Sequence, residues 1–510
     1  MATELFLLGV VLIGVVFVTW IGVRSGRGAS GTIEGWIAND RTMGPVLTWF
    51  LLGTEIYTAF TFLGLAGFAY INGGGAFYNV ATNDVGYALG FFVLPAIGLL
   101  GRRYGYLTQS DFIAGRYKSK ALGIAVSFCT AIIMIAYIDL NIEGLGAVLR
   151  VLTDGKINIL VADTIGFSVL SVAVFFGGIR GNAWQSVIKD MLMFGSIAVL
   201  FIVVPYRYFG GFGAMFHELI SRAPHNITMP GPSSKFGLSW FWTTVLVTGF
   251  GQWMWPQWFN VAFSARSSDT LKLQAVFMPL YQLVKVAVII VGFAAILIFA
   301  GHKVSGNDIV LLLAKQAFPP GLLALFALAA VLSAIVPAGP IIMMSCTLLA
   351  RNVYGQLRPG LSTQATFRIT RALVFVVTFI ALILAVAAQS LIVTILLLAY
   401  DFIAQLLPGV IIGGLFWRRA TGIGMAAGLA TGWIVTTVLL LTKNDPVWGL
   451  NAGFVALIAN CAVFWVVSLV TKPVSRDFID PFFQTLSGRR VSHVVGETAA
   501  IPKIVTGVLD

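Results

Sequence analysis

The sequence is poor in charge, in cysteine and in histidine, and each shortage excludes a class of protein. Only 10% of its 510 residues are charged, against about 25% in an average soluble domain, so the chain cannot cover itself with a water-facing surface. Three cysteines and four histidines are too few and too scattered for a disulfide framework or a metal site. No nucleophile elbow or zinc-protease motif occurs, so no enzyme and no cofactor are expected.

Long apolar runs take the place of charge. The chain is 58% hydrophobic, and runs of 18 or more apolar residues, each long enough for a hydrocarbon core of about 30 Å, recur from end to end. We predict an all-α polytopic membrane protein with about thirteen transmembrane helices. The expected spans are 4–23, 44–71, 85–101, 121–149, 158–178, 188–206, 237–262, 274–301, 319–350, 369–389, 391–415, 420–442 and 449–471.

The basic residues give the expected orientation. With the N-terminus outside and the C-terminus cytoplasmic, the cytoplasmic segments hold 23 of the 32 Lys and Arg residues and the outer segments hold eight. This positive-inside bias explains the net charge of +12 without a nucleic-acid partner. The expected location is the plasma (inner) membrane, with the lipid bilayer and a small solute as partners.

Two spans contain residues that interrupt helices. Span 44–71 carries Gly53, Thr54 and Thr58, and span 237–262 carries Gly249, Gly251 and Pro256. They are the second and seventh spans, so each begins a set of five, and an odd number gives the two sets opposite orientation. Such an inverted repeat with broken first helices is typical of transporters that bind solute near the midplane. The expected divisions are 1–43, 44–207, 208–236, 237–415, 416–471 and 472–510, in order a leading helix and loop, the first repeat, an outer loop, the second repeat, two further helices and a cytoplasmic tail.

Several short motifs resemble those of the sodium:solute symporters, a family with the LeuT-like fold. They are GWIANDRTMG after the first span, LTQSDFIAGRY at 107–117, FSARSSDTLK at 263–272 and ARNVYG at 350–355. Within that family, GTEIYTAFTF, GIRGNAWQSVIKD and VPAGPIIMMSCTLLARNVY are most similar to the monocarboxylate permease branch. The resemblance implies a LeuT-like 5+5 inverted repeat and a cation-coupled symporter, with a short monocarboxylate such as lactate or pyruvate as solute. A proton-coupled amino-acid or amine symporter and a non-transporting solute sensor are the alternatives.

Polar side chains inside the spans are the candidate solute ligands, because a charge in a membrane helix is expensive and usually faces a cavity or a partner. Glu55 lies in the expected break, where it either accepts a proton, anchors a substrate ammonium group, or caps the broken backbone. Asp139 and Glu143 share a helical face near Asn141, and they either bind a cation or pair with a basic residue. The predicted substrate-binding set is Glu55, Thr58, Asp139, Asn141, Gln252, Trp255 and Asp401.

Ion or proton coupling is assigned to a second set, and the coupling ion is H⁺ or Na⁺. By the resemblance, the carbonyl groups of Thr54 and Tyr57 and that of Ser333 would hold sodium, and Lys189 and Asp190 would lie near the ion route. The positions for the usual hydroxyl pair become Val336 and Pro337, or Ser333 and Ala334 after a three-residue shift. Either register lacks oxygen ligands that a hard cation prefers, so proton coupling is at least as favoured as sodium coupling. The titratable candidates are Glu55, the pair of Lys189 and Asp190, and the two acids Asp139 and Glu143. Lys285 is expected to extend its ammonium group to the inner face.

Overall fold

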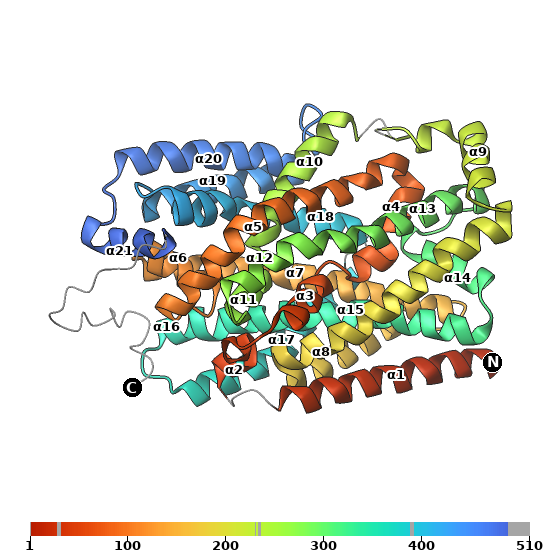
Figure 1. Ribbon diagram of the computed structural model, residues 1–510, viewed down its shortest axis with the longest axis horizontal. Helices are drawn as coiled ribbons and strands as arrows, with labels where there is room; N and C mark the ends of the chain where they lie inside the picture. Colours follow the sequence, from red (N-terminus) through yellow and green to blue (C-terminus); the bar gives the residue numbers. More distant parts are fainter. Residues whose placement is uncertain (1, 28–31, 230, 233–235, 388–391, 488–510) are drawn as a thin grey trace.

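Helices run back and forth between two ends of an elongated molecule, as Figure 1 shows. The computed structural model describes residues 2–27, 32–229, 231–232, 236–387 and 392–487. Within these ranges there is no β-strand, and two isolated β-bridges are the only strand-like pairing. Ten helical segments there are long and apolar enough to cross a membrane. The predicted all-helical membrane architecture is therefore confirmed, while the count of thirteen spans and the orientation of the termini stay predictions.

The elements up to the outer loop come first in the chain. They are α1 (Ala2–Gly26), α2 (Ile33–Ala38), η1 (Asn39–Arg41), α3 (Pro45–Thr54), η2 (Phe60–Gly64), α4 (Leu65–Asn72), η3 (Gly73–Phe77), α5 (Tyr78–Tyr104), α6 (Gln109–Tyr117), α7 (Lys120–Leu152), α8 (Ile159–Phe209), α9 (Phe212–Arg222) and η4 (Pro224–Asn226). Helix α9 lies within the predicted outer loop 208–236.

The elements after the outer loop complete the bundle. They are α10 (Leu238–Gly251), η5 (Gln252–Met254), α11 (Pro256–Ser264), α12 (Ser268–Phe277), η6 (Met278–Tyr281), α13 (Gln282–Ile298), η7 (Gly306–Asp308), α14 (Ile309–Ala317), α15 (Pro320–Thr347), η8 (Leu348–Tyr354), α16 (Gly355–Leu357), α17 (Thr363–Ala387), α18 (Ile392–Ile403), η9 (Ala404–Leu406), η10 (Pro408–Phe416), α19 (Gly422–Leu441), α20 (Ala452–Val470) and α21 (Arg476–Leu486).

The two predicted helix breaks are confirmed. Helix α3 ends at Thr54, and helical structure resumes only with the π-helical turn η2 at Phe60. Helix α10 ends at Gly251, and Trp255 has extended backbone with ψ of 127° before Pro256 begins α11. Both breaks leave backbone carbonyl groups without a partner in the helix, which only a buried cavity or a polar partner can compensate inside a membrane.

The connection inside α8 differs from the sequence prediction. Residues 158–206 were expected to form two spans, 158–178 and 188–206, and α8 does consist of two helices that meet at a kink at Gly178. Gly178 has a φ of 67°, in the left-handed region that glycine adopts readily. The residues expected between the two spans, 179–187, are helical, so the kink takes the place of the predicted loop. Lys189, counted among the cytoplasmic basic residues, is fully buried.

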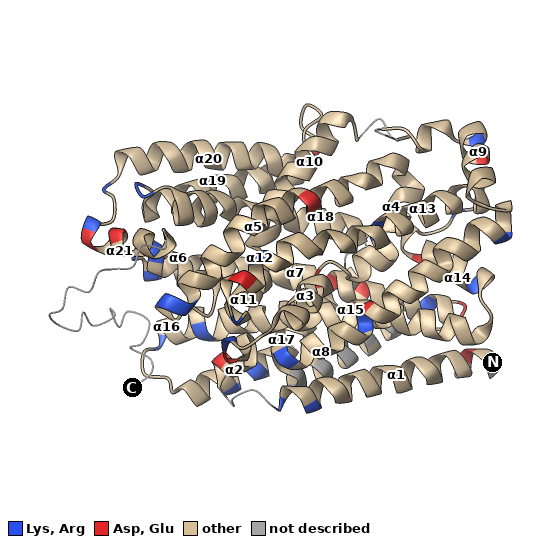
Figure 2. Ribbon diagram, in the orientation of Figure 1, with Lys and Arg blue, Asp and Glu red and all other residues tan. Residues whose placement is uncertain are grey.

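The burial pattern separates a central helix from peripheral ones. In the most apolar 18-residue stretch of the α15 segment, 83% of the residues are buried. The same share is 28% in α1 and 33% in each of α19 and α20. Figure 1 shows α1 along one edge of the molecule and α19 with α20 along the opposite edge. Figure 2 shows charged residues toward both ends of the molecule and several more in its middle.

Two motifs that are far apart in the sequence meet at the end that carries α6. Asp111, which caps the start of α6, accepts hydrogen bonds from Arg351 Nη1 at 2.6 Å and from Asn352 Nδ2 at 2.7 Å. Asp111 belongs to LTQSDFIAGRY, whereas Arg351 and Asn352 belong to ARNVYG in η8. Nearby, the buried Arg116 lies over the rings of Phe482 and Phe483 of α21, which attaches this part of the tail to the bundle.

Candidate solute pocket and ion site

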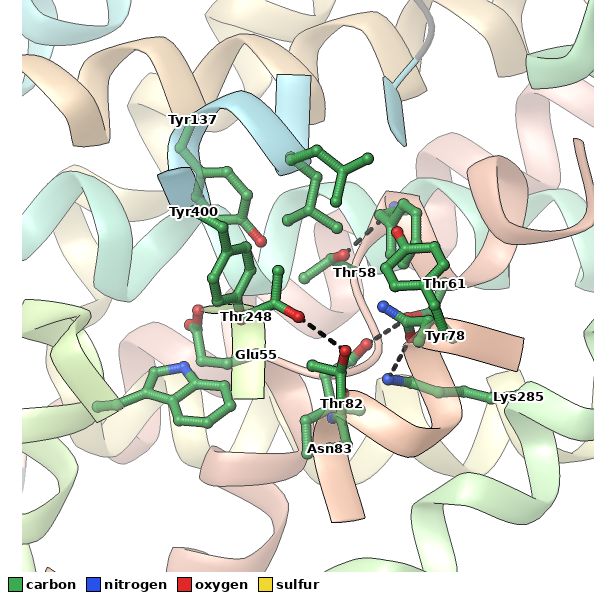
Figure 3. Close-up of a pocket in the computed structure, with 16 residues that line it drawn as sticks. Glu55, Thr58, Thr61, Tyr78, Thr82, Asn83, Tyr137, Thr248, Lys285 and Tyr400 are labelled. Atoms are coloured by element: carbon green, nitrogen blue, oxygen red, sulfur yellow. Dashed lines mark hydrogen bonds between the residues drawn. The ribbon is translucent and has the colours of Figure 1, made fainter. Parts of the chain in front are cut away.

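A polar pocket lies beside the break of the first repeat helix, and Figure 3 shows its lining. Its space between the atoms amounts to ≈ 430 Å³. The lining side chains come from the α3–η2 break, α5, α7, α10, α11, α13 and α18. They are Glu55, Ile56, Thr58, Phe60, Thr61, Tyr78, Asn79, Thr82, Asn83, Tyr137, Thr248, Trp258, Lys285, Leu396, Leu397 and Tyr400. The predicted spans 44–71, 121–149, 237–262 and 391–415 all contribute, together with α5 and α13.

Helix α5 supplies a polar face that the sequence prediction missed. Asn79, Thr82 and Asn83 follow helical spacing and line the pocket together. The hydroxyl groups of Thr82 and Thr248 are 2.7 Å apart, which links α5 to α10. The predicted span began at residue 85, whereas α5 begins at Tyr78. The polar residues were therefore left in a loop, although their spacing of three and four was visible.

Lys285 corrects one prediction directly. It was expected to extend toward the inner face, but only 2% of it is exposed and it lines the pocket. Its Nζ donates a hydrogen bond to Asn79 Oδ1 at 2.7 Å, drawn as a dashed line in Figure 3. Among the described residues it has no ion pair. An ammonium group has three N–H donors, so this buried cation retains unused hydrogen-bonding capacity beside the pocket.

Glu55 lies on the pocket wall as a buried carboxylate. Its Oε2 accepts a hydrogen bond from Gln257 Nε2 of α11 at 3.2 Å. Its Oε1 is buried and has no hydrogen-bond partner among the described residues. The carboxylate thus links the two broken helices through Gln257.

The second site lies on the other side of the same break. Lys189 Nζ donates to the carbonyl oxygens of Tyr57 at 2.8 Å and Thr54 at 3.3 Å, and it forms an ion pair with Asp190 Oδ1 at 2.8 Å. Asp190 Oδ2 accepts from the Tyr281 hydroxyl group at 2.8 Å. Lys189 and Asp190 are both 0% exposed. The structure therefore brings together four of the predicted coupling residues, Thr54, Tyr57, Lys189 and Asp190.

Tight packing holds this second site in place. Tyr57 donates its hydroxyl hydrogen to the Tyr281 carbonyl oxygen at 2.8 Å. A Cβ on Gly53 would come within 1.9 Å of the Tyr281 hydroxyl oxygen, so the close approach of η6 to α3 requires glycine there. We call Gly53, Thr54, Tyr57, Lys189, Asp190 and Tyr281 the ammonium cradle.

Ser333 was expected to offer sodium its carbonyl group or, after the three-residue shift, its hydroxyl group. Its hydroxyl group donates to the Ala330 carbonyl oxygen of its own helix at 2.7 Å. The positions expected for the hydroxyl pair, Val336 and Pro337, carry no side-chain oxygen. Because Pro340 has no N–H, the Val336 carbonyl group loses its helical donor, and Asn182 Nδ2 of α8 binds it at 2.6 Å instead.

The acidic face of α7 lies apart from the lining residues. Glu143 pairs with Arg150 Nη2 at 3.0 Å, which is the ion pair that the sequence left open. Asp139 is buried in the same helix, and Asp163 of α8 is a further buried acid that sequence analysis did not single out. Asn141 is fully buried, and neither of its amide atoms has a hydrogen-bond partner among the described residues.

The remaining predicted ligands lie outside the pocket lining. Trp255 packs its ring 4.6 Å from that of Tyr137 and 5.4 Å from that of Tyr400, so it supports two lining residues from behind. The amide of Gln252 packs against Gly86, where a Cβ would come within 2.0 Å of its Oε1. Asp401 faces α20, where a Cβ on Gly453 would come within 2.2 Å of its Oδ1.

Comparison with known proteins places this arrangement in a family. The sequence model of the sodium:solute symporter family matches residues 36–432. This stretch is more than half of the chain and includes both broken helices. The chain belongs to the sodium:solute symporter family. It is accordingly an integral multi-pass membrane protein and a cation-coupled symporter. The family is one of transporters rather than of enzymes.

Symporters of this family resemble the chain over most of its length. It is 35% identical to the uncharacterized symporter YhjB of Bacillus subtilis, covering 92% of this chain and 97% of that protein. It is 27% identical to a monocarboxylate transport permease protein of Rhizobium johnstonii, covering 86% and 90%. A monocarboxylic acid transporter of Corynebacterium glutamicum is 22% identical over 83% and 84% of the two chains.

Solved structures show that this symporter has the LeuT-like fold. A Na⁺-coupled sialic acid symporter superposes with a TM-score of 0.74 at 14% identity, over 92% of this chain and 98% of that one. The nucleobase-cation-symport-1 family transporter MHP1 in a closed conformation gives a TM-score of 0.55 at 13% identity, over 88% and 97%. At these identities the likeness concerns the fold alone.

Proposed function

We propose that the chain imports a short monocarboxylate, such as lactate or pyruvate, across the plasma membrane together with a cation. The observation that carries this proposal is the buried ammonium group of Lys285 on the pocket wall, which has a neutral amide as its hydrogen-bond partner. Asp84 of α5 attracts this ammonium group without forming an ion pair with it, and a buried cation without an ion-paired anion is expensive in a membrane. A carboxylate that enters the pocket offers that partner.

The rest of the lining suits a small organic anion. Thr58, Thr61, Thr82 and Asn83 offer hydroxyl and amide hydrogen-bonding groups around one side, which suit the carboxylate and a hydroxyl or keto oxygen beside it. Leu396 and Leu397 of α18 offer an apolar surface for a methyl group. The relatives that are named for monocarboxylate transport add support, because they align over most of the chain.

An amino acid is the second candidate, and a specific observation favours it. Glu55 lines the same pocket and keeps Oε1 free of partners among the described residues. A carboxylate and an ammonium group that line one pocket from opposite sides are complementary to the two charges of a zwitterion. Under this alternative Lys285 binds the carboxylate of the solute and Glu55 binds its ammonium group.

Uptake by purified protein in proteoliposomes tests the proposal. Labelled lactate, pyruvate, alanine and lysine are offered separately, with a sodium gradient and a proton gradient imposed one at a time. We expect lactate and pyruvate to accumulate and alanine and lysine not to. Uptake of alanine or lysine without uptake of lactate would refute the monocarboxylate assignment. Protein-free liposomes correct for the passive permeability of the protonated acids.

A further inference from the structure

We propose that Lys189 is a resident cation: its ammonium group occupies the place of a coupling sodium ion in the broken first-repeat helix, so this symporter transports without sodium at that place. The inference rests on the proposed function, in that it names the ion requirement of the same transport cycle. It departs from what the family name implies for this chain.

The first step is the origin of the two carbonyl groups. In inverted-repeat transporters, carbonyl groups freed where a helix unwinds coordinate the coupling ion. Here the amides of Ile56 and Tyr57 both donate to the Gly53 carbonyl oxygen. The Thr54 and Tyr57 carbonyl groups lie within the unwound stretch between α3 and η2. The break thus creates two carbonyl acceptors, and Lys189 binds both of them.

The second step is that the ammonium group already has two hydrogen-bond acceptors and an anion beside it. These are the Thr54 oxygen, the Tyr57 oxygen and Asp190 Oδ1, at 3.3, 2.8 and 2.8 Å. Two of these are hydrogen-bond acceptors, the carbonyl oxygens of Thr54 and Tyr57, and the third is the oxygen of an ion pair. Asp190 balances its charge, so Lys189 does not require the carboxylate of a solute as a partner. In this it differs from Lys285, which binds one neutral amide.

The third step is that a sodium ion finds no room here beside Lys189. An ion bound to the same two carbonyl oxygens would stand in contact with the ammonium group and be repelled by it. On the opposite helix, Val336 and Pro337 offer no side-chain oxygen, and the Val336 carbonyl group is already bound by Asn182. The Ser333 hydroxyl group is turned to its own helix. Lys189 therefore blocks this place, whereas without Lys189 the two carbonyl groups and Asp190 would remain as oxygen ligands for a cation.

The fourth step is that several packing and hydrogen-bond contacts hold the ammonium cradle in place. Lys189 is enclosed by the broken helix, α8 and η6, with no exposure. Tyr281 orients Asp190, and Gly53 admits Tyr281. A lysine that merely reached the membrane surface would need none of these contacts.

Sodium binding by the purified protein gives a test that needs no substrate. Thermal unfolding is measured in NaCl and in choline chloride at equal ionic strength, because a ligand that binds only the native state raises the melting temperature. We expect no sodium-specific rise for the wild type. For Lys189→Ala, which leaves the two carbonyl groups and Asp190 without their cation, we expect a rise in sodium. Lys303→Ala removes an exposed lysine and serves as the matched control, with no rise expected.

Transport gives the second readout. Lactate uptake driven by an imposed proton gradient should be the same, within about twofold, in sodium and in choline for the wild type. A sodium-specific rise in the wild-type melting temperature, or loss of wild-type uptake in choline, would overturn the inference. So would a folded Lys189→Ala protein that ignores sodium. If that variant does not fold, the wild-type measurements still decide.

The two proposals can fail separately. Should the wild type take up alanine and not lactate, the monocarboxylate assignment falls, while the melting temperatures still test Lys189. A sodium-dependent protein that takes up lactate would leave the solute assignment intact and refute the role of Lys189.

Discussion

The two buried lysines of this symporter lie on either side of one helix break and differ in what surrounds them. Lys189 binds two backbone carbonyl oxygens and the carboxylate of Asp190, whereas Lys285 binds the amide oxygen of Asn79 alone. Both are 2% exposed or less. Equal burial with unequal pairing separates a cation that the fold has already neutralised from one that a solute can neutralise. Burial alone would have assigned the two lysines the same role.

The largest expected effect removes the partner that neutralises Lys189. Asp190→Asn leaves a buried ammonium group without its anion, and breaking a buried ion pair in this way costs about 3–5 kcal/mol. We expect a large fall in the melting temperature of the purified protein.

A double variant supplies the control for that measurement. Lys189→Met with Asp190→Leu removes both charges at once, and apolar replacement of a buried pair is usually far milder. The double variant should recover part of the lost stability. If it is as unstable as Asp190→Asn, the ion pair is not what holds the ammonium cradle together.

The next effect concerns Lys285 and should appear in solute binding rather than in folding. Lys285→Gln keeps a hydrogen-bond donor for Asn79 but removes the charge. Loss of one partner of a buried charge pair costs about 2–5 kcal/mol of binding, so lactate affinity should fall by roughly 30-fold or more. The measurement is the concentration dependence of lactate uptake, and Lys272→Gln, on an exposed lysine of α12, is the control. Unchanged lactate affinity would mean that Lys285 does not bind the solute.

A smaller effect is expected where Tyr281 meets Asp190. Tyr281→Phe removes the hydroxyl group that donates to Asp190 Oδ2, and a hydrogen bond to a charged group contributes about 1.5–3 kcal/mol. The melting temperature should fall less than in Asp190→Asn. Tyr208→Phe, which removes an exposed hydroxyl group bonded to Gln316, should change it little. Equal falls in melting temperature for Tyr281→Phe and Tyr208→Phe would show that the Tyr281 hydroxyl group does not stabilise the ammonium cradle.

The smallest effect sharpens the choice between the two solutes. Glu55→Gln keeps the shape of the side chain and removes its negative charge. For a monocarboxylate we expect lactate affinity to hold or to improve by less than about tenfold, which is below ~1.4 kcal/mol. Competition of alanine against labelled lactate gives the comparison. A loss of lactate affinity as large as that of Lys285→Gln would show that Glu55 is needed to bind the anion.

Much of the fold followed from local sequence features. Runs of apolar residues predicted the helices, and Gly53 with Thr54 and Gly251 with Pro256 predicted the two breaks, because these residues act on their own stretch of backbone. The boundary at residue 178 was predicted, but a loop was expected there, and the two helices instead meet at one glycine with left-handed φ. That choice depends on packing, which the sequence does not display.

The structure likewise brings some of the predicted site residues together and places others elsewhere. Thr54, Tyr57, Lys189 and Asp190 were expected to serve ion coupling, and they do lie together. Lys285 was expected at the inner face, because its position within α13 does not reveal that Asn79, 206 residues earlier, lies within hydrogen-bond distance. Asp401 was expected beside the solute, yet it packs against Gly453 of α20. For such residues the partner on another helix decides the role.

The contact between Asp111 and Arg351 joins segments 240 residues apart into one charged unit. Neither residue can change alone without leaving a partly buried charge unpaired, and Asn352 depends on the same carboxylate. Across related chains these positions should therefore be inherited as a set, and acid at one should disappear in the lineages that lose the guanidinium group at the other.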